Sequence, residues 1–121
     1  NRQPGSGTRV LLDYELKRLQ IDPAGIRGYE RDEFTHMAVG VAVASGLADA
    51  GLGVRSAANA LDLDFLRVGE EQYDLVFLRS FFESKKGVRL LETIRSTGFK
   101  DAVRELGGYD TSRSGEILYR Q

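Results

Sequence analysis

Residues 35–54, which read THMAVGVAVASGLADAGLGV, contain the pattern that decides the fold. The first part is apolar nearly all round and opens on Thr35, a residue type that caps helix N-termini, so we expect a helix that ends near Gly46. A helix without a polar face is typical of a buried position. Residues 48–54 then predict a short strand, whose two glycines allow another backbone or a ligand to approach closely.

Helix and strand patterns alternate along the rest of the chain. Leucines at helical spacing predict a helix over residues 8–19, followed by a turn at Pro23 and Gly25. The other expected elements are an extended segment at 26–30, a helical turn at 55–61, strands at 65–68 and 73–78, helices at 86–96 and 99–106, and an irregular tail at 110–121. Strands separated by helices favour an α/β fold with helices packed on a mostly parallel sheet.

The composition predicts one domain over residues 1–121. A chain of 121 residues with 41% hydrophobic content can fill one core, which excludes a large two-domain enzyme. The absence of Cys excludes thiolate nucleophiles and zinc–thiolate sites, and a single His cannot build a His-rich metal centre. The 17 basic and 18 acidic side chains give a formal net charge of −1, which argues against binding to nucleic acid or to a membrane surface.

The ends of the chain carry two further expectations. Because the sequence opens at Asn1 without an initiator Met, we expect the C-terminal part of a larger protein. No signal peptide is visible, and no apolar run approaches the roughly 20 residues that a membrane helix needs.

The segment NRQPGSGTR, residues 1–9, has the composition of an anion-binding loop. Two glycines flank Ser6 and let backbone N–H groups turn inward, the hydroxyls of Ser6 and Thr8 add donors, and the helix start contributes N–H groups with partial positive charge. The segment also contains two arginines, Arg2 and Arg9, which favour an anion. Alternatively, Ser6 or Thr8 only caps the helix, and the arginines pair with Asp13 or another carboxylate. The Walker A pattern and a complete dinucleotide fingerprint are absent.

A second helix start lies at Thr35 and His36. Taken alone, it is explained by a Thr cap followed by a solvated or satisfied His. In a parallel α/β fold, however, helix starts follow the carboxyl ends of strands, so both starts could meet at one crevice. Micromolar binding needs about 8 kcal/mol, each charge-assisted hydrogen bond contributes roughly 1.5 to 3 kcal/mol, and association costs at least about 4 kcal/mol. Donors from the first loop alone therefore fall short.

No catalytic arrangement is indicated. Ser6 lacks a base and an orienting partner, because the one His belongs to a separate helix start and no GxSxG elbow occurs. Carboxylates between residues 49 and 74 have no recurrent spacing and are typical of a solvated edge. Basic residues between 79 and 104 are interleaved with acidic ones, as on an ordinary helix surface. We therefore expect neither an enzyme nor a metal site.

Several segments together resemble one family. They are NRQPGSGTRVLLD at 1–13, GYE at 28–30, THMAVGVAVASGLADAGLGV at 35–54, LDF at 63–65, EQYDLV at 71–76 and LGGYD at 106–110. Over nearly the whole chain, this combination resembles the periplasmic-binding-protein-like domain of molybdopterin-biosynthesis proteins and molybdate-linked helix-turn-helix regulators. The resemblance implies a type II binding-protein fold, similar to molybdate and tungstate binding proteins, truncated here to one main lobe, and a cytoplasmic location. The positions that match the family's anion loops are Ser6, Gly7, Thr8, Arg9, Thr35 and His36.

These observations favour a binding or sensing module for a small oxyanion, molybdate or tungstate, in a protein linked to molybdenum cofactor biosynthesis or its regulation. No cofactor beyond that ligand is expected. Two alternatives remain open. The chain could be a protein-interaction module that forms a homodimer without a small ligand, or it could hold a molybdopterin-related ligand or a nucleotide phosphate for a neighbouring catalytic domain.

Overall fold

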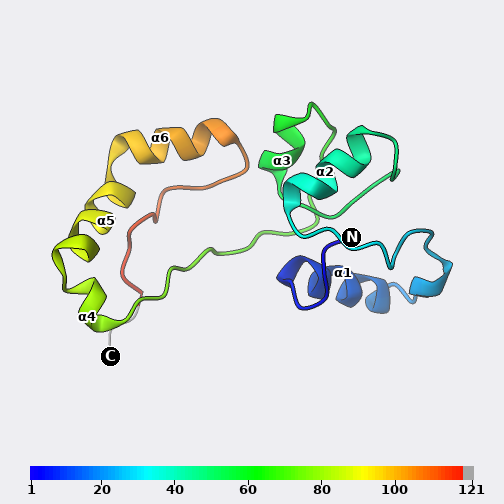
Figure 1. Cartoon of the computed structure of the whole chain (residues 1–121), viewed down its shortest axis with the longest axis horizontal. Helices are drawn as coiled ribbons and strands as arrows, with labels where there is room; N and C mark the ends of the chain where they lie inside the picture. Colours follow the sequence, from blue (N-terminus) through cyan, green and yellow to red (C-terminus); the bar gives the residue numbers. More distant parts are fainter. Residues whose placement is uncertain (119–121) are drawn as a thin grey trace. The chain divides into compact units, whose positions relative to one another are not determined.

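The computed structural model describes residues 1–118 and divides the chain into two compact units, Asn1–Phe65 and Leu66–Gln121 (Figure 1). Both units consist of short helices, of 4 to 12 residues, joined by segments without regular structure. They are described separately below.

The first unit contains α1 (Gly7–Arg18), a 3-10 turn η1 (Pro23–Gly25), α2 (His36–Ala44) and α3 (Arg55–Ala60). The three helices confirm the predictions at 8–19, 35–46 and 55–61 to within about two residues, the usual uncertainty of helix ends. Local signals explain the agreement, because Ser6 caps α1 and Thr35 caps α2. The chain leaves α2 through Gly46, whose positive φ of 74° favours glycine.

Two short extended segments, residues 1–3 and 31–33, run parallel and side by side. Arg2 forms an isolated parallel bridge with Glu33. The Glu33 N–H donates to the carbonyl of Asn1 at 2.7 Å, and the Gln3 N–H donates to the carbonyl of Glu33 at 3.2 Å. Each segment leads within a few residues into a capped helix, so α1 and α2 both begin beyond the same end of this parallel pair.

The core of the first unit lies where α2 packs on α3. Val39 is only 3% exposed, and Ala42 of α2 and Ala57 of α3 are also buried. Small side chains let the two helices approach closely, since a Cβ added at Gly40 would stand 2.7 Å from Cδ1 of Leu61. Within α2, the buried residues are Val39, Gly40 and Ala42.

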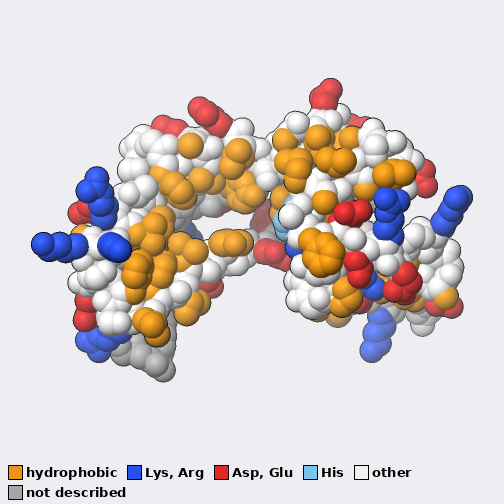
Figure 2. Space-filling view, viewed as in Figure 1, with side chains coloured by type: hydrophobic (Ala, Val, Ile, Leu, Met, Phe, Trp, Pro, Cys, Tyr) orange, Lys and Arg blue, Asp and Glu red, His pale blue; other side chains and the backbone are white. Residues whose placement is uncertain are grey.

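The opposite face of α2 is open, which corrects the expectation of a helix buried all round. Met37 is 44% exposed and Val41 is 49% exposed. Figure 2 shows hydrophobic side chains gathered on the visible face of this part of the chain. The physical reason is the small number of elements in a unit of this size, which cover one side of α2 and leave the other to solvent.

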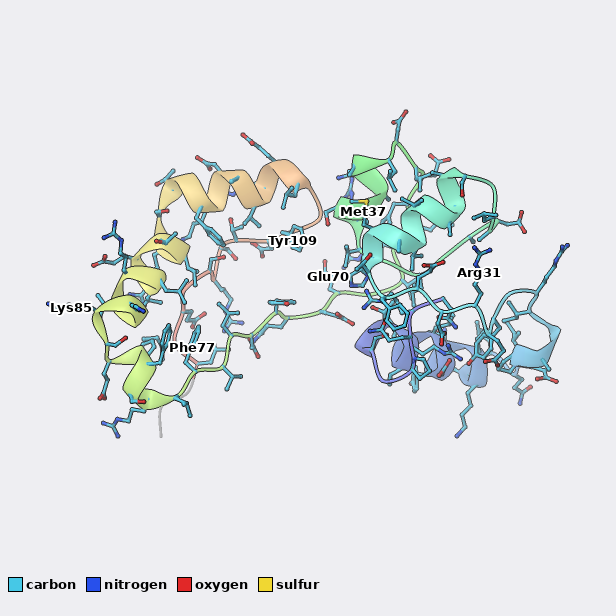
Figure 3. All side chains as sticks on the ribbon, viewed as in Figure 1. Arg31, Met37, Glu70, Phe77, Lys85 and Tyr109 are labelled. Carbon is cyan, nitrogen blue, oxygen red and sulfur yellow. The ribbon has the colours of Figure 1, made fainter. Side chains whose placement is uncertain are left out.

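The second unit contains α4 (Arg79–Phe82), α5 (Lys85–Arg95) and α6 (Thr97–Leu106). The last two agree with the predicted helices at 86–96 and 99–106, and both begin at serine caps, Ser84 and Ser96. The sequence did not predict α4. It follows a segment in which Phe77 stacks on Phe81 of α4, with ring centroids 5.5 Å apart (Figure 3).

Beyond α6, residues 107–118 form neither helix nor strand. Two arginines attach this segment to the helices, because Arg95 Nε donates to the carbonyl of Gly115 at 2.9 Å and Arg104 Nε donates to Thr111 Oγ1 at 3.0 Å. The last part of the predicted irregular tail, residues 119–121, lies outside the described residues.

The predicted α/β fold is wrong for the part of the chain that the structure describes. Helix accounts for 47% and strand for 2%, and residues 1–118 form no sheet. The segments predicted as strands at 48–54, 65–68 and 73–78 have no ladder partner there, and the predicted extended segment at 26–30 forms turns. Strand propensity largely measures packing against neighbouring strands. An apolar run without such a neighbour therefore remains outside any sheet.

Candidate functional site

The start of α1 is built by a tight turn and a serine cap. Gly5 has a positive φ of 85°, and the Ser6 N–H donates to the carbonyl of Gln3 at 3.3 Å. The Ser6 Oγ then accepts the Arg9 N–H at 3.2 Å. Within residues 1–118, the N–H groups of Gly7 and Thr8 have no hydrogen-bond acceptor. They are the donors that a helix start leaves available to an anion.

The start of α2 also carries a side-chain cap. Thr35 is in an extended conformation, and its Oγ1 accepts the Ala38 N–H at 3.0 Å. The next residue, His36, is partly exposed, and a Cβ added at Gly53 would stand 3.9 Å from its Nδ1. The glycine-containing segment after α2 therefore returns to the first turn of that helix. At 3.9 Å an added Cβ would make only ordinary contact, so Gly53 is not required for this approach; at Gly51, by contrast, an added Cβ would collide with Cγ1 of Val39.

The parallel pair brings the two helix starts into one region of the first unit. Ser6 belongs to the turn that begins at Gln3, which limits their Cα separation to about 7 Å. Thr35 lies two residues beyond Glu33, so at most about 7 Å of chain separates them. Since Gln3 and Glu33 are hydrogen-bonded to each other, both caps are anchored to one short stretch of paired backbone.

Arg9 is buried, unlike the other predicted site residues, and its guanidinium is bonded to several protein groups. The residue is 8% exposed. Its Nε donates to Asp13 at 3.1 Å, and its Nη1 donates to Asp32 at 3.1 Å and to the carbonyl of Arg2 at 3.4 Å. The guanidinium carbon also lies 4.2 Å from the centroid of the Tyr29 ring. The alternative that Arg9 pairs with Asp13 thus describes the observed geometry.

The same contacts change two pKa values. Burial alone would lower the pKa of Arg9, but hydrogen bonds and charge interactions with Tyr29 and Asp13 outweigh it and raise that pKa. The pKa of Tyr29 is raised above its ordinary value, chiefly because the hydroxyl donates a hydrogen bond to the Asp13 carboxylate. A phenolate at that position would face a negative charge. The cluster is therefore most favourable with Arg9 charged and Tyr29 neutral.

An open groove of about 410 Å³ begins at Thr35 and runs along the exposed face of α2. It is lined by Glu33, Thr35, Met37, Ala38, Val41, Ala42 and Leu47. Figure 3 marks Met37 on α2 and Arg31 in the segment before it. Glu33 brings a carboxylate to the polar end of the groove, and Arg31 pairs with that carboxylate at 3.7 Å. The groove joins the α2 start to an apolar surface.

The structure thus brings together the predicted residues Ser6, Gly7 and Thr8 at one helix start and Thr35 and His36 at the other. Sequence reasoning missed Tyr29 and Asp32, which contact Arg9. The sequence predicts only one contact of this cluster, the pair of Arg9 and Asp13, because these residues are four positions apart on one helix. Within residues 1–118, no group of three or more His, Cys, Asp or Glu side chains could hold a metal ion, and no helix is long and apolar enough to cross a membrane.

The chain is similar to a protein family and to known proteins. A family model described as the PBP superfamily domain matches residues 1–95. The uncharacterized protein YvgK of Bacillus subtilis (strain 168) is 39% identical over 118 residues, which are 98% of this chain and 38% of that protein. An uncharacterized protein in the 5′ region of the 2Fe-2S ferredoxin gene of Clostridium pasteurianum is 36% identical over 110 residues, covering 90% of this chain and 97% of that protein. No solved structure matches.

Proposed function

The chain belongs to the PBP superfamily, the periplasmic-binding-protein-like domains, and from this premise we propose that it binds a small oxyanion between the starts of α1 and α2. Membership of a family of binding domains favours ligand binding in general over catalysis. Molybdate or tungstate is the favoured ligand because of the resemblance of residues 1–13 and 35–54 to molybdate-linked proteins. On the same ground, we propose a role in molybdenum cofactor biosynthesis or its regulation.

The observation that supports this proposal most directly is the pair of capped helix starts beyond one end of the parallel segments. Each start presents backbone N–H groups and hydroxyls at the positive end of a helix dipole. Neutral donors of this kind can bind an oxyanion through hydrogen bonds and the helix dipole, without a positively charged side chain in contact with it. The nearby carboxylates of Asp13 and Asp32 are paired with Arg9, which limits their repulsion of an anion.

Energetics favour the use of both helix starts. The available donors of the first are the N–H groups of Gly7 and Thr8 with the hydroxyls of Ser6 and Thr8; at about 2 kcal/mol each they gain about 8 kcal/mol. Association costs at least about 4 kcal/mol, so the first start alone gives roughly millimolar binding. The Thr35 hydroxyl and the Met37 N–H add about 4 kcal/mol. The net of about 8 kcal/mol then corresponds to micromolar affinity.

Isothermal titration of the chain with molybdate, tungstate, sulfate and phosphate tests this proposal. We expect heat of binding with molybdate or tungstate. Ser6→Ala with Thr8→Ala should lose at least tenfold in affinity, since two hydrogen bonds of about 2 kcal/mol each correspond to roughly a thousandfold. The matched control is Ser96→Ala with Thr97→Ala, which removes the serine cap and first threonine of α6 instead. Absence of heat with all four anions would refute the proposal. If both double variants lost the same affinity, the hydroxyls at the start of α1 would act only as helix caps and not as ligands of the anion.

Self-association of two copies through the groove along α2 is the second candidate function. The observation that favours it is the apolar surface of Met37, Val41 and Leu47, which are 44%, 49% and 61% exposed. Sedimentation equilibrium should then show a dimer that Val41→Asp dissociates. A monomer at all concentrations would exclude this function.

A further inference from the structure

We propose that Arg9 is a positioning residue whose guanidinium fixes the start of α1 relative to the start of α2, instead of contacting the anion. Its effect on binding rests on the oxyanion function proposed above. Its effect on the arrangement of the two segments stands on the contacts of Arg9 alone, and the two effects can be measured separately.

The positive charge of Arg9 lies at an unfavourable location and needs other groups to stabilise it. It is the third residue of α1, where the positive end of the helix dipole opposes a cation. Burial of the side chain adds a desolvation cost, because a charged group taken from water needs paired hydrogen bonds. An arginine is therefore stable here only because its partners surround it.

Those partners belong to four different parts of the first unit. Nη1 donates to the carbonyl of Arg2 in one parallel segment and to the carboxylate of Asp32 in the other. Nε donates to Asp13 on α1 itself. Tyr29, which lies just before the second segment, places its ring under the guanidinium carbon, 4.2 Å from the ring centroid, and donates its hydroxyl to Asp13. One side chain thereby joins α1 to both members of the parallel pair.

This arrangement links the two halves of the proposed oxyanion site. Asp32 lies three residues before Thr35, the cap of α2, and Arg9 lies three residues after Ser6, the cap of α1. The planar guanidinium can hold several acceptors at fixed angles, whereas a lysine ammonium is a flexible point charge. Arg9→Lys should therefore retain the charge but lose the fixed spacing of the two caps.

The two possible roles of Arg9 predict opposite changes in anion affinity when the Asp32 charge is removed. If Arg9 binds the anion directly, Asp32→Asn releases one of its donors and removes a repelling charge, so affinity should rise. If Arg9 positions the helix starts, Asp32→Asn weakens the connection; because Arg9 already compensates the Asp32 charge, this loss outweighs the removed repulsion and affinity should fall. The matched control is Glu15→Gln, which makes the same change of charge at the partner of Arg18 on α1.

The first experiment is titration of molybdate into the wild type and these variants. Arg9→Lys and Asp32→Asn should each weaken binding by about tenfold or more, the size of one lost charge-assisted hydrogen bond, whereas Glu15→Gln should bind like the wild type. Unchanged or tighter binding by Asp32→Asn would overturn the positioning role.

The second experiment needs no ligand. Amide hydrogen exchange at Gln3 and Glu33 reports the pairing of the two segments, because both N–H groups are bonded across the pair. We expect both amides to exchange about tenfold faster in Arg9→Lys and Asp32→Asn, but not in Glu15→Gln. Unchanged exchange would overturn the inference even if molybdate binds. Faster exchange in a protein that binds no molybdate would refute the oxyanion function and support the positioning role.

Discussion

Gly87→Ala should destabilise the second unit, although alanine normally favours a helix. Gly87 is the third residue of α5, and its N–H donates to the Ser84 cap at 3.2 Å. A Cβ added there would stand 2.6 Å from the carbonyl oxygen and 2.8 Å from Cα of Phe82, and it would also collide with the carbonyl oxygen of Phe81. All three are backbone atoms of α4. They cannot move aside without displacing that helix.

The size of the effect follows from two opposing contributions. Glycine to alanine inside a helix gains up to about 1 kcal/mol in propensity. Overpacking costs about 1 to 3 kcal/mol and occasionally more, and collision with backbone places Gly87 at the upper end. We therefore expect a net loss of about 2 kcal/mol, which corresponds to a decrease in Tm of roughly 10 °C for a unit of this size.

Thermal unfolding followed by far-ultraviolet circular dichroism measures this difference. Gly98→Ala is the matched control, because it makes the same change in the first turn of α6, where no atom lies within 4 Å of the added Cβ. That variant should be as stable as the wild type or slightly more stable. A Gly87→Ala protein at least as stable as Gly98→Ala would refute the close packing of α4 on α5.

Two further predictions concern the first unit. Tyr29 should titrate above its unfolded pKa of about 10. A raised folded-state pKa favours the protonated form. The contribution of Tyr29 to stability is therefore present below pH 10 and is lost as pH rises through the folded-state pKa. Absorbance titration should show this raised component in the wild type and not in Tyr29→Phe, and loss of a component with an ordinary pKa would contradict the assignment. Leu16→Ala, at a side chain only 6% exposed, should lower the free energy of unfolding by about 2 to 5 kcal/mol. Val10→Ala on the same helix, at 60% exposure, should change it by no more than about 0.5 kcal/mol, and equal effects in urea unfolding would exclude the assigned burial.

Much of the helical structure could be predicted because its signals are local. Ser6, Thr35 and Gly46 each cap or end a helix through groups only a few residues away, so sequence spacing placed these helix ends to within about two residues, although it left the cap of the first helix open between Ser6 and Thr8. The expected sheet was wrong for the opposite reason. An apolar run such as residues 73–78 becomes a strand only beside another strand, and no property of the run itself supplies that partner.

The candidate site divides in the same way. The sequence by itself determined that helices would begin at Ser6 or Thr8 and at Thr35 and that their first turns would present N–H donors, because a helix start leaves those groups unbonded wherever it occurs. Only the tertiary structure decided that both helices begin beyond one parallel pair and that Arg9 connects them. These contacts join residues more than twenty positions apart, and the burial that makes them strong exists only after the chain has folded.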